Sequence, residues 1–364
     1  MITIDGSYGE GGGQVLRTSL TLSALLSRPM RIERIRAGRR NPGLQAQHLT
    51  GVRATAQVCG AELEGAKLGS QTLTFVPQSP PRAGEYAFDV AEARKGGSAG
   101  ATSLVLQTLL LPLAFASATS RLTLQGGTHV AWSPPFHYLE WVYLPTLARM
   151  GIEADVSIER WGWYPIGGGV MKASVKGRGN EGHGPEDRDL SLAPRSLLPL
   201  DLTQRGTLRR LHGLSALSNL PMHIAERQRK RAVEILRAEG FAPEIEVVNA
   251  PAKGRGTCVF LLAEYENGLA GFTALGARGK PAEKVAEEAC RDFLAYHKSG
   301  ACLDMHLADQ LILPMALARG PSAFTTCRIT QHLLTNIWVV EQFMDVRFEV
   351  EGKEGGRGRV TVHV

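Results

Sequence analysis

One order of elements recurs along the sequence: a short strand, a cluster of glycines, a helix, a strand, a second helix and closing strands. In the first copy, an alternating strand at Ile2–Asp5 leads through the glycine-rich stretch Gly6–Gly13 into a helix over Gln14–Leu26. In the second copy, the cluster Gly96–Gly100 leads into a helix over Ala101–Ala116. Self-similarity of this kind predicts repeated α/β units, each of which needs its neighbours to bury its apolar face.

The remaining elements extend both copies. The first continues with a strand at Met30–Arg36, a helix at Gly43–Cys59, and strands near Leu63 and at Thr72–Val76. The second comprises a strand at Tyr86–Val90, its glycine cluster and helix, a strand at Arg121–Gln125, a helix at His137–Met150, and strands at Ile152–Ile158 and Gly169–Val175.

A third copy is interrupted. After a polar connection at Lys176–Pro194, the sequence predicts a strand at Leu198–Thr203, a charged helix at Met222–Glu239, strands at Glu244–Val248 and Cys258–Tyr265, and a helix at Ala282–His297. The tail then returns to the first style, with helices at Asp304–Leu317 and Thr330–Phe343 and strands at Val346–Glu351 and Arg359–Val362. We therefore expect an α/β protein of the α+β type: a large domain over residues 1–186 and 299–364, and a small α/β domain over 187–298.

Composition excludes several classes of protein. Hydrophobic residues make up 43% of the 364-residue chain, enough to fill a core, so a disordered chain is excluded. A net charge of +6 permits a polyanionic partner without requiring one. The five cysteines form no CxxC pair, which argues against a zinc ribbon and fits reduced thiols. The most apolar run, Leu104–Ala116, is too short to span a bilayer, and no signal peptide is visible. We expect a cytoplasmic protein without membrane association.

The first candidate site is the stretch Gly9–Gln14, which runs into a helix. Consecutive glycines expose backbone N–H groups, and the helix N-terminus adds partial positive charge, so an anion can bind there. A carboxylate beside such an anion makes sense with a divalent cation between them, so Glu10 is a candidate ligand for Mg²⁺ or Mn²⁺. A solvated turn glutamate is the alternative. The stretch is no dinucleotide fingerprint, because Gln14 stands where the last glycine is needed.

The second candidate is a run of basic residues. Five arginines lie within ten residues, at positions 31, 34, 36, 39 and 40. If the strand extends to Arg36, this side chain and Arg34 share one face. Arginine suits phosphate oxygens, which favours a nucleotide or nucleic-acid phosphate. A solvated basic face is the alternative. Gln47 and His48 follow at the start of the next helix and supply further polar groups.

The third candidate pairs two segments near the end of the chain: His306 to Gln310, and Thr330 to Asn336. Thr330 is a suitable N-cap, which places His332 in the first turn of a helix. There the positive helix end favours the neutral, nucleophilic imidazole. A packed or capping histidine is the alternative interpretation. Asp309 could orient a histidine or remain an exposed carboxylate.

Together these motifs resemble those of the RNA 3′-terminal phosphate cyclase family. The resemblance is carried by six segments in family order, from residue 5 to about residue 345: DGSYGEGGGQVLRTSL, IRAGRRNPGLQAQHL, RKGGSAGATSLVLQTLLLPL, GWYPIGGG, HLADQLILPMAL and ITQHLLTN. The chain departs from the family at Trp161, where a basic or imidazole side chain is usual, which questions a local packing or RNA contact.

The resemblance implies three repeats of two helices on a four-stranded sheet, with a small α/β domain inserted in the third. It implies ATP-dependent conversion of an RNA 3′-terminal phosphate to a 2′,3′-cyclic phosphate through a covalent enzyme-histidyl-AMP and an RNA(3′)pp(5′)A intermediate. The nucleophile maps onto His332. Two alternatives remain: a non-catalytic RNA-binding ribosome-assembly factor of the same fold, or, by fold-level analogy with another repeat-built transferase, a phosphate-handling metabolic enzyme.

The resemblance also implies roles for further residues. ATP is the expected adenylyl donor, Mg²⁺ or Mn²⁺ the cation on Glu10, and an RNA with a 3′-phosphate end the partner; the oligomeric state stays open, with a homodimer as one option. The expected catalytic arginines are Arg17, Arg36 and Arg39, and the expected substrate-phosphate residues are Gln14, Gln47 and His48. The expected adenylate pocket comprises Gln107, Pro134, Phe272, His306, Asp309 and Gln310, although family members often have tyrosine in place of His306.

Overall fold

The computed structural model describes residues 1–93, 98–178 and 196–364. The glycines predicted to open the second helix, Gly96 and Gly97, lie outside this range, as does most of the predicted connection Lys176–Pro194. Four sheets of four strands each make up the β-structure of the described residues.

The first repeat forms the first sheet with its two helices. Its elements are β1 (Ile2–Asp5), α1 (Gly13–Leu26), β2 (Met30–Glu33), α2 (Ala46–Cys59), β3 (Glu62–Glu64) and β4 (Leu73–Val76). Strand order is β1-β2-β4-β3, with β1 and β2 parallel and the other pairs antiparallel.

The second repeat has the same topology. Its elements are β5 (Glu85–Asp89), a 3₁₀ turn η1 (Val90–Ala93), α3 (Thr102–Ala114), β6 (Ser120–Gly126), α4 (Phe136–Tyr138), a π-helical turn η2 (Leu139–Tyr143), α5 (Leu144–Ala148), β7 (Ala154–Arg160) and β8 (Gly169–Val175). Strand order is β5-β6-β8-β7. The single helix predicted over His137–Met150 is therefore divided by a π-turn.

The third repeat repeats this order around an insertion. Its elements are β9 (Asp201–Leu202), α8 (Met305–Gln310), α9 (Ile312–Ala316), β14 (Ser322–Thr326), α10 (Gln331–Phe343), β15 (Arg347–Gly352) and β16 (Gly358–His363). Strand order is β9-β14-β16-β15, and β9 pairs in parallel with β14. The first strand of this repeat thus lies about a hundred residues before its first helix.

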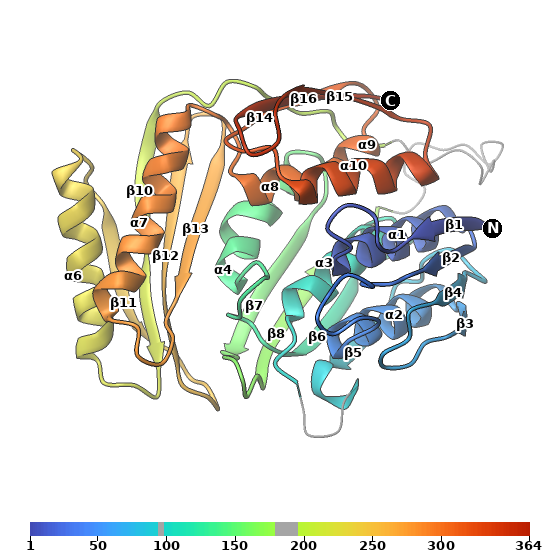
Figure 1. Ribbon diagram of the computed structural model, residues 1–364, viewed down its shortest axis with the longest axis horizontal. Coiled ribbons are helices and arrows are strands. Elements are labelled where there is room, and N and C mark those ends of the chain that lie inside the picture. The colour runs from blue at the N-terminus through green and yellow to red at the C-terminus, as the bar shows by residue number, and fades with distance from the viewer. Residues whose placement is uncertain (94–97, 179–195) are drawn as a thin grey trace.

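The inserted segment forms the fourth sheet. Its elements are β10 (Leu208–Ser218), α6 (His223–Ala238), β11 (Glu244–Asn249), β12 (Gly256–Tyr265), β13 (Leu269–Leu275) and α7 (Ala282–Ser299). Strand order is β11-β10-β12-β13, and α6 and α7 cover one face (Figure 1). This face has its own hydrophobic core, separate from that of the repeats.

Two expectations about these strands were wrong. The strand predicted at Leu198–Thr203 does not open the insertion. Only Asp201–Leu202 form a strand, β9, and this strand pairs with β14 of the third sheet. The insertion instead opens with β10, and it also contains β13; neither strand was expected. Strand β10 begins with a polar segment, and β13 is rich in glycine and alanine, which are poor strand formers, so both patterns are weak.

The helices of the repeats lie inside the large domain, and the sheets lie outside (Figure 1). Helices α1, α2, α3 and α10 pack against one another, and one hydrophobic core joins residues of all three repeats. Helix α1 is buried on nearly every side, with Val15, Ser19 and Leu22 among its buried residues. No helix in the described ranges combines the length and apolar character that crossing a membrane would require.

Strand β2 is shorter than predicted, which changes the arginine cluster. It ends at Glu33, and both Arg34 (φ 54°) and Arg36 (φ 53°) adopt the left-handed conformation. The expectation that these two arginines share one face of a strand was therefore wrong. The chain turns here instead, and the arginines lie on a loop that leads to α2.

Candidate active site

The candidate site lies where α1, α2 and α10 begin. The amide of Gln14, in the first turn of α1, donates a hydrogen bond of 3.1 Å to the backbone oxygen of His332, in the first turn of α10. A Cβ built on Gly13 would lie 2.3 Å from His48 Nε2, so the first turns of α1 and α2 also touch. Three helix N-termini therefore meet, and their partial positive charges favour an anion between them.

His332 occupies the centre of this arrangement. The Thr330 hydroxyl accepts a hydrogen bond from the backbone N–H of Leu333 and caps α10, as predicted. His332 Nε2 lies 2.9 Å from Glu10 Oε2, and Nδ1 lies 4.0 Å from Asp309 Oδ2. Burial is the main cause that lowers the pKa of His332; Glu10 opposes it, and the nearby arginine charges add to it. The imidazole therefore lies between the Glu10 carboxylate and the carboxyl group of Asp309, in a setting that favours its neutral form.

Glu10 and Gln14 are suited to a divalent cation. The Glu10 carboxylate accepts from Arg39 at 3.0 Å as well as contacting His332. The Gln14 amide nitrogen donates to the backbone oxygen of His332. The amide oxygen of Gln14 is buried and has no hydrogen-bond partner within the described residues. A carboxylate and a carbonyl-type oxygen are ligands that Mg²⁺ and Mn²⁺ accept. In the described part of the chain, no three histidine, cysteine or acidic side chains are arranged so that they could hold a metal ion by themselves. Oxygens of a bound phosphate would have to complete the coordination.

Gly13 packs directly against the side chains of Arg17 and His48. A Cβ on Gly13 would lie 3.0 Å from Arg17 Nη1 as well as meeting the imidazole, so the position requires glycine. Burial, with the charges of Arg17 and Arg36, lowers the pKa of His48 to about 3. The neutral ring accepts from the backbone N–H of Gln45 through Nδ1 at 3.1 Å, so Nε2 carries the proton. His48 therefore presents an N–H donor beside the Arg17 guanidinium, and burial lowers the pKa of Arg17 only to about 10.

Two other predicted phosphate-binding residues are engaged by backbone. Arg36 Nη1 donates to the carbonyl oxygens of Asn41 and Gly43, at 2.6 and 2.9 Å. This guanidinium therefore fixes the loop before α2. Gln47 accepts from the backbone N–H of Ala101 at 3.1 Å and joins the start of α2 to the start of α3. Both residues lie at the edge of the cluster, where Arg36 fixes the loop before α2 and Gln47 joins α2 to α3.

Four of the residues predicted for the adenylate pocket, Gln107, His306, Asp309 and Gln310, lie close together. Gln107 on α3 donates to Gln310 on α8 at 2.6 Å, and Gln310 donates to the backbone oxygen of His306 at 2.8 Å. Asp309 lies on the same helix and faces His332. Burial, opposed by the charge of Arg17, raises the pKa of Asp309 to about 8. Three predicted residues of α8 therefore lie beside the nucleophile candidate, and His306 is the most exposed of them.

Phe272 and Pro134 are not brought to this cluster by any contact of the described residues. Phe272 on β13 packs against Phe293 and Tyr296 of α7, in the core of the insertion. Its neighbour Gly271 faces Tyr138 of the second repeat, so Phe272 points to the other side of the sheet. Pro134 is half-buried in the loop before α4. For Phe272 the geometry disagrees with the role that the resemblance implied.

Comparison with known proteins then decides the family. A family model described as RNA 3′-terminal phosphate cyclase matches residues 8–350. A Methylococcus capsulatus protein named RNA 3′-terminal phosphate cyclase is 53% identical over 363 residues, which is 100% of this chain and 96% of that protein. Proteins of the same name from Gloeothece citriformis and Pyrobaculum neutrophilum are 47% and 44% identical; these matches cover 94% and 96% of this chain, and 93% and 95% of theirs. The chain belongs to the RNA 3′-terminal phosphate cyclase family.

A likeness to a solved structure adds nothing to this conclusion. The enolpyruvyl transferase NikO from Streptomyces tendae matches with a TM-score of 0.27 at 18% identity. The match covers 53% of this chain and 33% of that one. A likeness this weak supports no inference about fold or function.

Two supporting residues of this cyclase-family chain were given no role from the sequence. The Thr18 hydroxyl donates to Asn336 at 2.9 Å, and the Asn336 amide donates to the backbone oxygen of Asp309 at 3.0 Å. These contacts fix α8 and α10 relative to α1. Asn336 lies one helical turn after His332, and that spacing could have indicated its position beside the site. Thr18 gave no sequence signal.

Trp161, the departure from the family pattern, is a packing residue. It is buried and stacks on His129, with ring centroids 3.8 Å apart and an interplanar angle of 4°. His129 in turn lies 3.1 Å from His137, Nε2 to Nδ1. The indole covers a buried histidine pair, and burial lowers the pKa of both imidazoles. The local packing therefore accommodates the substitution, far along the chain from the cluster around His332.

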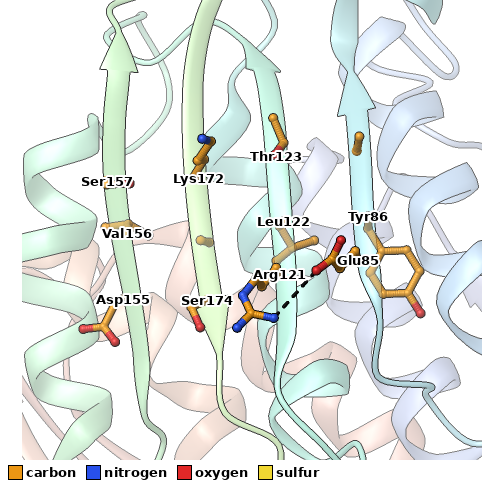
Figure 2. Close-up of a pocket in the computed structure, with 12 residues that line it drawn as sticks. Glu85, Tyr86, Arg121, Leu122, Thr123, Asp155, Val156, Ser157, Lys172 and Ser174 are labelled. Carbon is orange, nitrogen blue, oxygen red and sulfur yellow. Dashed lines mark ion pairs between the residues drawn. The ribbon is translucent and has the colours of Figure 1, made fainter.

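A shallow pocket of about 510 Å³ lies elsewhere, on the outer face of the second sheet. Figure 2 shows its polar side chains standing on β5, β6, β8 and β7, with Arg121 and Glu85 joined as an ion pair of 3.7 Å. Lys172 pairs with Glu159 on the same sheet. None of the predicted site residues lines this pocket. Its charges compensate one another, as is typical of a solvated sheet face.

Proposed function

We propose that this protein converts an RNA 3′-terminal phosphate to a 2′,3′-cyclic phosphate at the expense of ATP, with His332 as the nucleophile. One observation carries the proposal: His332 lies at a helix N-terminus, in a cluster of Glu10, Arg17, Arg39 and His48 drawn from the first and third repeats. Family membership and the names of the relatives support the overall reaction.

The reaction begins with His332 acting on ATP. A neutral ring nitrogen attacks the α-phosphorus, the P–O bond to pyrophosphate breaks, and a phosphoramidate forms. Glu10 lies 2.9 Å from Nε2 and favours a proton on that nitrogen, whereas Asp309 lies 4.0 Å from Nδ1, beyond hydrogen-bond distance. A cation bound to the Glu10 carboxylate would weaken this contact and would leave the Nε2 lone pair for attack. Nε2 faces Glu10 and Arg39, where the phosphates would lie. A divalent cation held by Glu10 and Gln14 would neutralise phosphate charge.

Two further transfers complete the reaction. An oxygen of the RNA 3′-phosphate attacks the same phosphorus, the P–N bond breaks, and RNA(3′)pp(5′)A forms. The vicinal 2′-OH then loses its proton, attacks the activated RNA phosphorus and displaces AMP, in an intramolecular step that benefits from proximity. The Arg17 guanidinium and the Nε2–H of His48 would bind the RNA phosphate; the position of both donors beside Gly13 supports this role.

The cytoplasm is the proposed site of this reaction. All five cysteines are free thiols, and four of them are buried. Free thiols are typical of a reducing compartment.

The direct test uses a 5′-labelled RNA with a 3′-phosphate, ATP and Mg²⁺ or Mn²⁺. We expect the phosphate to become resistant to phosphatase, with one AMP and one pyrophosphate released for each end converted. The same RNA with a 3′-hydroxyl is the matched control and should consume no ATP beyond the one molecule that adenylylates each enzyme chain. A ribosome-assembly factor would bind RNA without releasing pyrophosphate, and that result would replace the proposal with the rival function.

A further inference from the structure

Three exposed hydrophobic side chains lie on two neighbouring turns at one end of the second sheet. Trp132 is 99% exposed, Tyr164 77% and Ile166 56%. The turns lie side by side because His129 and Trp163 form a β-bridge between them. Trp132 also has a positive φ of 64°, which is costly for a bulky residue. A tryptophan held in water by a strained turn contributes nothing to the core, so a binding role explains it better.

Basic side chains lie beside these turns. An open depression of about 560 Å³ is formed by the second turn and by the insertion loop that carries Lys253 and Arg255. Both side chains are exposed, neither has an ion-pair partner in residues 1–93, 98–178 and 196–364, and no acidic residue lines the depression. Asn219 donates to the backbone oxygens of Ala252 and Gly254 and holds the loop in place. Unlike the sheet face of Figure 2, this region is positive without compensation.

This aromatic–basic surface, defined as Trp132, Tyr164, Ile166, Lys253 and Arg255, is linked to the candidate active site through backbone contacts. Gln47, at the edge of the phosphate cluster, accepts from the backbone of Ala101. Ala101 forms a β-bridge with Gly127 at the start of the loop that carries Trp132. A Cβ on Gly167, in the Tyr164 turn, would lie 2.9 Å from Ala99. Residues 99–101 thus link the aromatic–basic surface to the edge of the phosphate cluster.

We propose that the aromatic–basic surface binds the single-stranded RNA segment that precedes the terminal phosphate. Bases stack on Trp132 and Tyr164, and backbone phosphates contact Lys253 and Arg255. Aromatic faces with nearby cations are the usual platform for single-stranded nucleic acid, and they bind it with little sequence preference. The inference rests on the proposed function, since it supplies the path for the substrate whose end reacts at His332.

Binding is measured first, without ATP, so that chemistry plays no part. The probe is a 5′-fluorescein decamer of RNA with a 3′-phosphate, followed by anisotropy. Trp132→Ala should raise its Kd about 5- to 150-fold, the range of one lost base stack. Trp132→Phe keeps an aromatic face and should restore binding. The inhibition constant of a dinucleotide with a 3′-phosphate, measured by competition, should be the same for the wild type and Trp132→Ala because the dinucleotide reaches only the phosphate cluster.

The charges are tested by salt dependence. Removing two phosphate contacts with the double variant Lys253→Gln/Arg255→Gln should reduce the slope of log Kd against log salt by about 1.4. The matched control is Arg229→Gln/Lys230→Gln on α6, which removes the same charge from exposed residues that also lack an ion pair among the described residues. The control should keep the slope of the wild type.

The outcomes separate this inference from the proposed function. If the wild type cyclises the decamer but Trp132→Ala and the Lys253/Arg255 variant bind it like the wild type, the aromatic–basic surface is overturned while the function stands. If the wild type forms no cyclic phosphate yet the variants lose binding, the surface stands and the proposed function falls. Equal losses for the decamer and the dinucleotide would also overturn the surface, because they would indicate damage to the phosphate cluster.

Discussion

Replacing Glu10 by glutamine should lower the pKa of His332 by about one unit. The carboxylate lies 2.9 Å from Nε2 and favours the charged imidazolium, against the effect of burial. At this distance Coulomb's law gives about 1.4 kcal/mol in water and about 5.7 kcal/mol at an effective dielectric constant of 20. The two side chains are 44% and 35% exposed, so solvent screening favours the lower figure. Dividing by about 1.36 kcal/mol per pKa unit gives the predicted shift.

The assay is an NMR titration of the histidine ring signals, with the signal of His332 assigned by its absence in His332→Ala. Glu33→Gln is the matched control: it removes the same charge from a residue that pairs with Arg31 at 2.8 Å. The control should leave the pKa of His332 unchanged. The shift in Glu10→Gln should shrink at high salt, because the pair is partly exposed. An unchanged or increased pKa in Glu10→Gln would refute the assigned electrostatics.

Three further predictions concern the site and its surroundings. Gly13→Ala places a Cβ 2.3 Å from His48 Nε2, so kcat/KM for phosphate-terminated RNA should fall at least about tenfold while the circular dichroism spectrum stays unchanged. Burial raises the pKa of Asp309 to about 8. Between about pH 4 and pH 8 the folded state therefore holds a proton that the unfolded chain has released. The free energy of unfolding falls as the pH rises through this range. Urea titrations of Asp309→Asn should therefore show a flatter pH dependence, by up to about 1.4 kcal/mol per pH unit. Trp161→Ala leaves the ring of His129 uncovered and should cost about 3–5 kcal/mol of unfolding free energy, whereas Trp132→Ala, at an exposed site, should cost under about 0.5 kcal/mol.

The sequence was sufficient to predict the elements that follow strong periodicity. The helices at α1, α2, α3 and α10 and the interruption of the third repeat were predicted because apolar spacing and glycine clusters mark them. Strand β13 was missed, since glycine and alanine give no strand pattern, and β9 was assigned to the wrong sheet because its partner β14 lies over a hundred residues away. Pairing between such distant segments leaves no local trace.

The site was predictable in its residue types but less so in its geometry. Thr330 and the helix pattern placed His332 in a first turn, and the structure confirms the cap. Arg36 donates to carbonyl oxygens of its own loop, and this contact was not predictable from the sequence. It depends on a positive φ at Arg36 that no residue pattern indicated. Phe272 fits the aromatic type expected of an adenylate pocket, but the pleat of β13 turns it into the core of the insertion.

Covalent adenylylation in the absence of RNA tests the central claim most directly. The protein is incubated with ATP labelled in the α-phosphate, and the adduct is tested for acid lability and base stability and located by peptide mapping. We expect one acid-labile, base-stable adenylyl group per chain on His332, absent from His332→Ala and retained by His306→Ala. Equal labelling of the wild type and His332→Ala, or a label mapped to another residue, would contradict it.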